Sequence, residues 1–218
     1  MASQAREGAW KFVGGRLCLD FVNTVGGRVG TPRATTRNFA DHVVREKLTG
    51  YGDLVGWGQL AGVLTARDRD GLLRASRIRP SEADRVYRRS LDLREAAYRL
   101  FKAALEGWEP RREDAQVLNQ EVSVARTHER LVGTSKGFTW EWDDRGPLLD
   151  RVVWPLACSV ADLLTSKDLA RVRQCGGLEC GWLFLDTSRN RSRQWCDMRD
   201  CGNLAKVRRF RQRHRNGG

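Results

Sequence analysis

The chain has 218 residues, of which 40% are hydrophobic and 8% aromatic, and this composition excludes a disordered tail because it supplies enough apolar side chains for a buried core. The formal net charge is +12, and the sequence contains no run of 18 apolar residues, which excludes a membrane span. The first residues contain no apolar stretch typical of a secretory signal, so we expect a cytoplasmic protein whose six cysteines stay reduced.

The first fifty residues predict short strands, a loop and a short helix. Residues 10–13 and 17–22 have the composition of strands, and the Gly-Gly pair between them is suited to a hairpin turn. Residues 26–37 are rich in Gly, Pro and Thr, which predicts a loop. Residues 39–47 predict a short helix.

The central part of the chain predicts amphipathic helices in succession. Asp53 is expected to cap the first of them, because apolar residues follow it at helical spacing. Thr65 and Asp68 form a capping-box pattern that opens a second helix. A third helix is expected to begin at Ser81 and to end near Gly107.

The last elements before the cysteine-rich segment are a helix, a hairpin and a second helix. Residues 113–124 predict the first helix, and residues 130–132 and 138–142 predict the hairpin strands. A long apolar helix is expected over 148–164, with a kink at Pro155. The predicted fold class is therefore α+β, with a helix-dominant N-terminal domain and short antiparallel strands.

The positive charge is concentrated near the C-terminus. Residues 171–218 contain twelve Lys and Arg against four Asp and Glu, so they carry eight of the twelve excess positive charges, together with four of the six cysteines. This change of composition predicts a regulatory domain over 1–168 and a basic module over 169–218. Because an anionic polymer attracts charges that are held close together, nucleic acid is the expected partner of the module.

Four cysteines in this module have the spacing of a metal site. Four residues separate Cys175 from Cys180, fifteen separate Cys180 from Cys196, and four separate Cys196 from Cys201. Two close pairs joined by a connecting segment suit a tetrahedral ion, and zinc accepts four thiolates. We expect one structural zinc, because four thiolates leave no coordination position for water or substrate. Two disulfides, or an iron–sulfur cluster, are the alternatives.

The residues after Cys201 predict a basic helix. Leu204, Val207, Phe210 and His214 fall along one side of it, and we expect this stripe to dock on the zinc module. The cationic side chains of the helix and of the segment between the cysteine pairs are the candidate nucleic-acid contacts: Arg189, Arg191, Arg193, Lys206, Arg208, Arg209, Arg211, Arg213 and Arg215.

The module resembles the CGNR zinc finger family. The similar motifs are Trp182-Leu183-Phe184 followed by Asp186, Ser188, Arg189 and Asn190, and then Cys201-Gly202-Asn203-Leu204-Ala205-Lys206-Val207-Arg208-Arg209. Leu204 stands where the family has the Arg of its name. Residues 17–25 and 53–57 are similar to motifs of the ABATE domain, which the family pairs with this finger. The resemblance implies a bacterial, stress-responsive transcription regulator that binds DNA through the finger.

Two polar residues of the N-terminal domain are candidate ligand contacts. Asp20 and Asn23 lie at the end of an expected strand before a Gly-rich loop, a position where ligand-binding groups occur, although Asn there is also an ordinary turn residue. Motifs of nucleotide-binding enzymes and of hydrolases are absent, so we expect no enzyme activity.

Three functions follow from these features. The first is a zinc-dependent, DNA-binding transcription regulator, which could act as a homodimer. The second is an RNA-binding accessory protein that uses the same basic face. The third is a small-molecule sensor or protein-interaction module in which the zinc finger is only structural. The sequence does not identify an effector.

Overall fold

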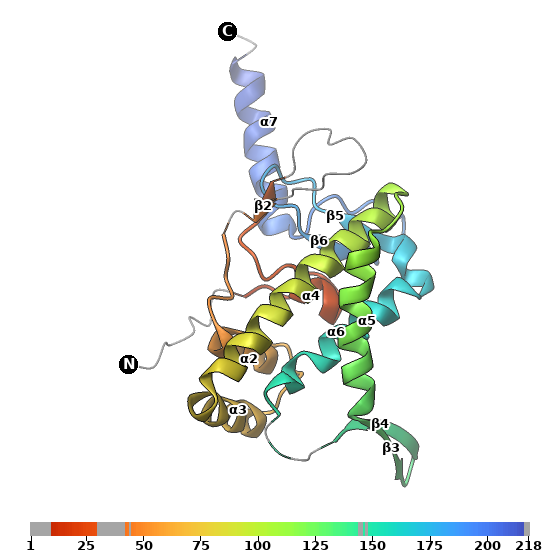
Figure 1. Ribbon diagram of the computed structural model, residues 1–218. Coiled ribbons are helices and arrows are strands. Elements are labelled where there is room, and N and C mark those ends of the chain that lie inside the picture. The colour runs from red at the N-terminus through yellow and green to blue at the C-terminus, as the bar shows by residue number, and fades with distance from the viewer. Residues whose placement is uncertain (1–9, 30–41, 44, 144–145, 147, 216–218) are drawn as a thin grey trace.

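A computed structural model describes residues 10–29, 42–43, 45–143, 146 and 148–215 (Figure 1). Its elements are the helices α1 (Leu17–Val22), α2 (Tyr51–Leu60), α3 (Ala66–Ile78), α4 (Pro80–Glu106), α5 (Arg112–Thr127), α6 (Trp154–Leu164) and α7 (Asn203–Arg215), and the strands β1 (Arg28–Val29), β2 (His42–Val43), β3 (Glu129–Thr134), β4 (Gly137–Trp142), β5 (Val172–Gln174) and β6 (Leu183–Leu185). Short helical turns are η1 (Leu149–Val152), η2 (Lys167–Arg171) and η3 (Met198–Gly202).

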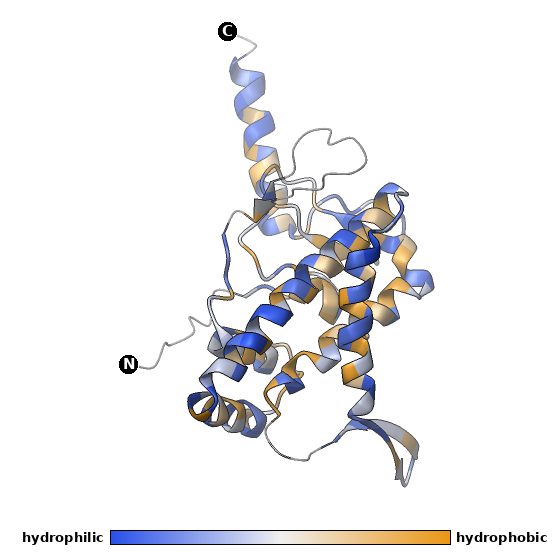
Figure 2. Cartoon of the chain, in the orientation of Figure 1, coloured by the Kyte–Doolittle hydropathy of each residue, from blue (hydrophilic) through white to orange (hydrophobic). Residues whose placement is uncertain are grey.

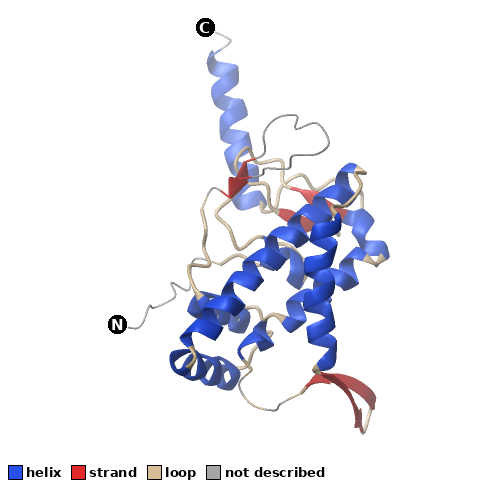
Figure 3. Cartoon of the chain, viewed as in Figure 1, coloured by secondary structure: helices blue, strands red, loops and turns tan. Residues whose placement is uncertain are grey.

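Helices dominate the structure, and the strands pair two by two in antiparallel ribbons (Figure 3). The four cysteines precede the last helix, α7. The expected fold class, helix-dominant with short antiparallel strands and a C-terminal four-cysteine module, is therefore confirmed. Within the described residues, no helix is both long enough and apolar enough to cross a membrane.

Helix α4 is the centre of the helical body, by which we mean the packed helices α1 to α6. It spans 27 residues, and α1, α2, α3, α5 and α6 all pack against it. Its buried face includes Leu93, Ala97 and Phe101, none of them exposed to solvent. Figure 2 shows apolar residues where α4, α5 and α6 meet and hydrophilic residues on their outer faces. This distribution is typical of helices that bury one face in a common core.

The helix boundaries follow the capping signals of the sequence closely. Thr65 and Asp68 form both halves of the predicted capping box at the start of α3. Helix α4 begins at Pro80, one residue before Ser81, because proline needs no hydrogen bond to its nitrogen in the first turn. It ends at Gly107, whose φ of 68° lies in the left-handed region that favours glycine.

Several predicted elements are wrong. Residues 17–22 form helix α1 and not a strand, because their apolar residues lie on one helical face that is buried against α4 and α6. Residues 10–13 have no strand assignment, so the Gly-Gly pair leads into α1 instead of joining two strands. The predicted loop at 26–37 contains strand β1, and residues 30–37 lie outside the described part.

Three further expectations are corrected in detail. Within 39–47, residues 42–43 form β2, while 39–41 and 44 lie outside the described residues. Asp53 lies inside the first turn of α2, where its carboxylate accepts hydrogen bonds from the Thr49 N–H and hydroxyl. The expected long helix is divided into η1 and α6, and Pro155 occupies the first turn of α6 instead of kinking it.

The C-terminal module shares the core of the body. Val172, Leu183 and Leu185, from β5 and β6, are buried in the same apolar cluster as Leu19 and Leu93. The module therefore buries apolar side chains in the core of the body in addition to its metal site. A second apolar cluster, which contains Trp182 and two of the cysteines, surrounds the expected metal site.

Candidate metal centre and nucleic-acid interface

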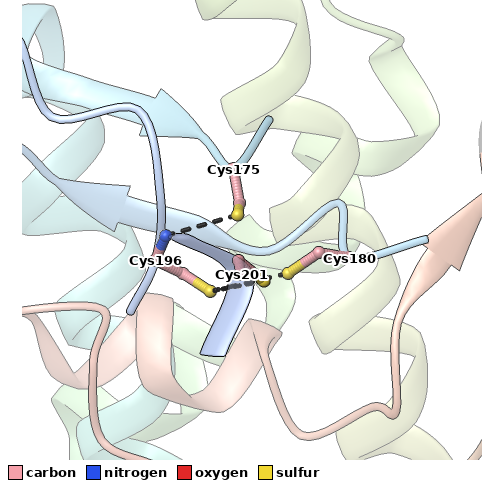
Figure 4. A group of neighbouring side chains, drawn as sticks. All are labelled: Cys175, Cys180, Cys196 and Cys201. Carbon is pink, nitrogen blue, oxygen red and sulfur yellow. Dashed lines mark hydrogen bonds between the residues drawn. The ribbon is translucent and has the colours of Figure 1, made fainter. Parts of the chain in front are cut away.

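The four cysteines converge at the end of the β5–β6 ribbon (Figure 4). Cys175 follows β5, Cys180 precedes β6, and Cys201 belongs to η3. One sulfur atom from each cysteine lies within 4.8 Å of the other three. The Sγ atoms of Cys180 and Cys196 are 3.5 Å apart, and those of Cys196 and Cys201 are 3.7 Å apart.

These separations fit zinc. Four sulfurs at about 2.3 Å from a central ion are about 3.8 Å from one another. A disulfide requires a separation of about 2.05 Å, so the quartet is not paired into disulfides. Gly177 faces the sulfur cage, because a Cβ at this position would lie 3.1 Å from the Cys201 sulfur and 3.6 Å from the Cys175 sulfur. A residue without a side chain therefore leaves the space that the ion needs.

The pKa values of the four thiols are shifted in different directions by their close packing. Hydrogen bonds from the Cys180 and Cys196 thiols lower the pKa of Cys175. The same hydrogen bonds raise the pKa of Cys180 and of Cys196, and desolvation raises the pKa of Cys201. Without a metal, Cys175 is therefore favoured as a thiolate, whereas the other three cysteines favour the protonated thiol. A bound dication stabilises all four thiolates and so removes this difference. The backbone N–H of Cys196 also donates to the Cys175 sulfur at 3.3 Å.

Asn23 holds the metal module against the body. Its side-chain amide donates to the Leu183 carbonyl at 2.8 Å, and its side-chain oxygen accepts from the Leu183 N–H at 2.9 Å. These two bonds satisfy the backbone groups of Leu183 on the edge of β6 that does not pair with β5. The Trp182 indole donates to the Val25 carbonyl at 3.1 Å, and the Arg28 N–H donates to the Cys180 carbonyl at 3.0 Å. All of these contacts join the segment after α1 to the module.

Both predicted ligand contacts have partners within the chain. Asn23 is 3% exposed, and both polar atoms of its side chain bond to Leu183. The Asp20 carboxylate accepts a hydrogen bond from the Gly14 N–H at 2.7 Å. Burial raises the pKa of Asp20 to about 6. Asn23 therefore joins the end of α1 to β6, and Asp20 holds Gly14, whose carbonyl accepts from the Leu185 N–H at 2.7 Å. Ligand binding by either residue stays a prediction.

Replacing Asn23 tests this role. In Asn23→Ala, the Leu183 N–H and carbonyl stay buried without partners, so we expect a loss of about 2–3 kcal/mol in the free energy of unfolding. Chemical denaturation followed by tryptophan fluorescence measures the loss. Asn190→Ala, at an exposed position of the same module, is the control and should change stability by less than about 0.5 kcal/mol. Equal stability of the two variants would contradict the role assigned to Asn23.

A buried ion-pair network lies beside the module, and no pattern in the sequence predicts it. The Arg94 side chain is 2% exposed and contacts Glu46 at 2.6 Å and Glu95 at 2.9 Å. The Arg28 side chain is 1% exposed, contacts Glu95 at 2.6 Å, and stacks over the Tyr98 ring at 3.9 Å. This network connects α4 to the segment that carries β1, next to Cys180.

The basic helix α7 does not dock on the metal module as predicted. It follows η3 directly and extends away from the body (Figure 1), and none of its side chains is buried. Leu204 is 70% exposed, Val207 47% and Phe210 63%. The expectation was wrong because helical spacing shows that a stripe exists but does not show what covers it.

The candidate nucleic-acid residues divide into two groups. The α7 residues and two of the loop arginines are exposed: Lys206, Arg208, Arg209, Arg211, Arg213, Arg215, Arg189 and Arg191. Arg193 is different, because its guanidinium donates to the carbonyls of Trp195, Val13 and Cys196 and lies 4.3 Å from the centre of the Phe184 ring. Arg193 therefore has a structural role in this loop, and its contact with nucleic acid stays a prediction.

A groove of about 1110 Å³ lies between the first turns of α7 and residues 176–180, which we call the metal loop. Its cationic residues are Lys11, Lys47, Arg208, Arg209 and Arg211, and its apolar residues include Leu178, Trp195, Leu204 and Val207. Lys11 pairs with Asp200, and Lys47 lies over the Trp182 ring at 4.9 Å. The three arginines of the groove all belong to the α7 wall. Within the described part of the chain, no carboxylate lies within salt-bridge distance of the α7 cations.

A helical body that carries a closed four-thiolate centre and an exposed basic helix defines a zinc-finger protein. Residues 15–167 match the family model ABATE, described as "Putative stress-induced transcription regulator", and residues 171–214 match the CGNR zinc finger. The chain belongs to the ABATE family and ends in a CGNR zinc finger.

The site and the family together establish one structural zinc held by the cysteine quartet. A comparison with curated proteins gives no match. Both families are regulatory or zinc-finger families and not enzyme families.

Proposed function

We propose that this protein is a zinc-dependent, DNA-binding transcription regulator that acts in the cytoplasm. In this proposal, residues 1–168 are the regulatory domain, and residues 169–218 bind DNA through α7 and the exposed loop arginines. The metal crosslinks the loop from which α7 begins and takes part in no chemistry, because four thiolates leave no free position.

The observation that carries the proposal is the exposed charge of α7, whose cations have no carboxylate partner among the described residues. Lys206, Arg209 and Arg213 follow one another at spacings of three and four residues, and so do Arg208, Arg211 and Arg215. Like charges at these spacings repel and destabilise an isolated helix. A helix of 13 residues with no buried side chain is itself marginal in water. Phosphates supply the opposite charge that would stabilise it, and Arg suits them because its donors form a fork.

The salt dependence of binding tests the proposal. If α7 and the loop form four to six phosphate contacts, log K plotted against log salt should have a slope of about −4 to −5. The double substitution Arg208→Ala with Arg209→Ala should weaken binding to all duplexes and reduce this slope by about 2. Arg88→Ala with Arg85→Ala, on the exposed face of α4, is the charge-matched control. Unchanged affinity in the α7 variant, or a flat salt dependence, would exclude this interface.

RNA, a second copy of the chain and other proteins are further proposed partners. Competition between duplex DNA and structured RNA would distinguish a DNA-binding protein from an RNA-binding one. A homodimer, or a protein-interaction role, is favoured by one face of the β3–β4 hairpin, where the cross-strand partners Leu131 and Trp140 are 54% and 62% exposed and Phe138 is 77% exposed. Large exposed apolar faces commonly mark protein contacts.

A further inference from the structure

The apolar stripe of α7 is exposed between two rows of cations. Leu204, Val207 and Phe210 are each about half exposed or more. Lys206, Arg209 and Arg213 lie on one side of this stripe, and Arg208, Arg211 and Arg215 lie on the other. A helix bound to phosphates by only one face would need one cationic row. Two rows with an apolar ridge between them match a surface that has two rows of negative charge and an apolar floor.

The major groove of duplex DNA is such a surface. It is about 12 Å wide, which admits one α-helix, and a phosphate backbone borders it on each side. A helix can enter it only if the body does not cover its flanks. Helix α7 meets this condition, because it leaves the body at η3 and extends for about 20 Å with no buried side chain. Arg208 and Arg211 line the groove between α7 and the metal loop, so one of the two cationic rows faces this groove.

The chemistry of the ridge restricts which bases it can recognise. Leu204, Val207 and Phe210 offer no hydrogen-bond donor or acceptor, so they cannot read the polar edges of base pairs. The apolar group in the major groove is the 5-methyl group of thymine. Building on the DNA-binding function proposed above, we propose that the Leu204–Val207–Phe210 ridge packs on thymine methyl groups in the major groove, while the two cationic rows contact the two backbones. The protein then prefers duplexes that present methyl groups at pyrimidine C5.

Other occupants of the ridge fit the observations less well. A second copy of α7 would bring six more cations and no carboxylate to the ridge, and like charges would repel. A membrane surface favours a wide apolar face, whereas only three large apolar side chains lie on this helix of 13 residues.

The experiment compares duplexes that differ only in the methyl group. Zinc-loaded full-length protein is titrated, by fluorescence anisotropy, against alternating A·T duplexes of about 30 base pairs that contain either thymine or deoxyuridine. A second pair of alternating G·C duplexes contains either cytosine or 5-methylcytosine. We expect about four- to tenfold tighter binding to the methylated member of each pair, because burial of each methyl group contributes about fourfold in affinity.

Variants of the ridge connect this preference to α7. Phe210→Ala places a good helix former in an exposed position and should lower the thymine-to-uracil ratio by about fourfold, the contribution of one methyl group. Ile78→Ala, which removes an 81% exposed apolar side chain from the end of α3, should leave the ratio unchanged. Arg208→Ala should weaken binding to both duplexes equally.

The outcomes separate the two proposals. Equal affinity of the intact protein for thymine and uracil duplexes would overturn methyl recognition and leave DNA binding in place. A methyl preference that is undiminished in Phe210→Ala would also overturn the role of the ridge. Absence of binding to every duplex would overturn both proposals. A protein dimer that Phe210→Ala dissociates would show that the ridge contacts a second copy instead.

Discussion

Removing the zinc will unfold the segment from β5 to α7 and will also lower the melting temperature of the helical body. Apparent zinc-binding free energies of four-ligand sites are about 10–16 kcal/mol at neutral pH, so the quartet is the strongest single constraint on this segment. Val172, Leu183 and Leu185 belong to the core of the body, and unfolding of the segment exposes that core. A loss of about 3 kcal/mol by the body corresponds to about 6–12 °C in a protein of this size.

Hydrogen exchange and calorimetry measure these two effects. After chelation, backbone amides of residues 172–174 and 183–185 should lose protection, and the calorimetric transition should move to lower temperature. Cys201→Ser should reproduce both changes and should lose the single zinc seen by native mass spectrometry. Cys158→Ala is the matched control, because Cys158 is a buried cysteine outside the quartet. Protection that persists in the metal-free protein would contradict the assigned role of the ion.

Arg94→Met will destabilise the body by about 3–5 kcal/mol. The substitution keeps a long side chain in the buried position but removes the guanidinium that Glu46 contacts, whereas Glu95 keeps its contact with Arg28. Removing one member of a buried ion pair costs about this much, because an uncompensated charge stays behind. Urea denaturation measures the change. Arg88→Met is the control on the same helix, since the Arg88 side chain is 74% exposed and its pair with Asp84 contributes about 0.5 kcal/mol or less.

The same variant changes the response to acid. Desolvation raises the pKa of Glu46, but the hydrogen bond and charge of Arg94 outweigh it and lower the pKa below the ordinary value of 4.5. The pKa of Glu95 is lowered too, because the hydrogen bond and charge of Arg28, with the charge of Arg94, outweigh desolvation. A carboxyl group whose pKa is lowered by folding stabilises the protein above its unfolded pKa, and this stability disappears as the pH falls through the folded pKa. Arg94→Met should therefore lose less stability than the wild type between pH 5 and pH 3; an equal loss would contradict the assignment.

Local patterns in the sequence were sufficient for several features. The capping box of Thr65 and Asp68 and the left-handed Gly107 depend on residues close in the chain, so the sequence predicts them correctly. Residues 17–22 were assigned wrongly because a run of six mostly apolar residues fits a buried strand as well as a buried helix. Only the packing of this run on α4 and α6 decides between the two.

The roles of single polar residues depended on distant contacts. Asn23 bonds to Leu183, which lies 160 positions later in the chain, and Arg193 donates to the carbonyl of Val13, 180 positions earlier. Local composition predicts a ligand contact for Asn23 and a phosphate contact for Arg193, but it cannot predict these bonds. Their actual partners come from segments that only the fold brings together.

The sequence by itself determined the metal site, the helical character of the body and the position of the positive charge. Metal ligation follows from the type and spacing of four cysteines, and helix formation follows from periodicity and caps, so neither needs knowledge of the whole fold. The tertiary structure decided that β5 and β6 share the core of the body, that Arg94 is buried, and that α7 extends away with its apolar ridge uncovered. These features depend on which surfaces meet, and a one-dimensional pattern records the character of each surface but not its partner.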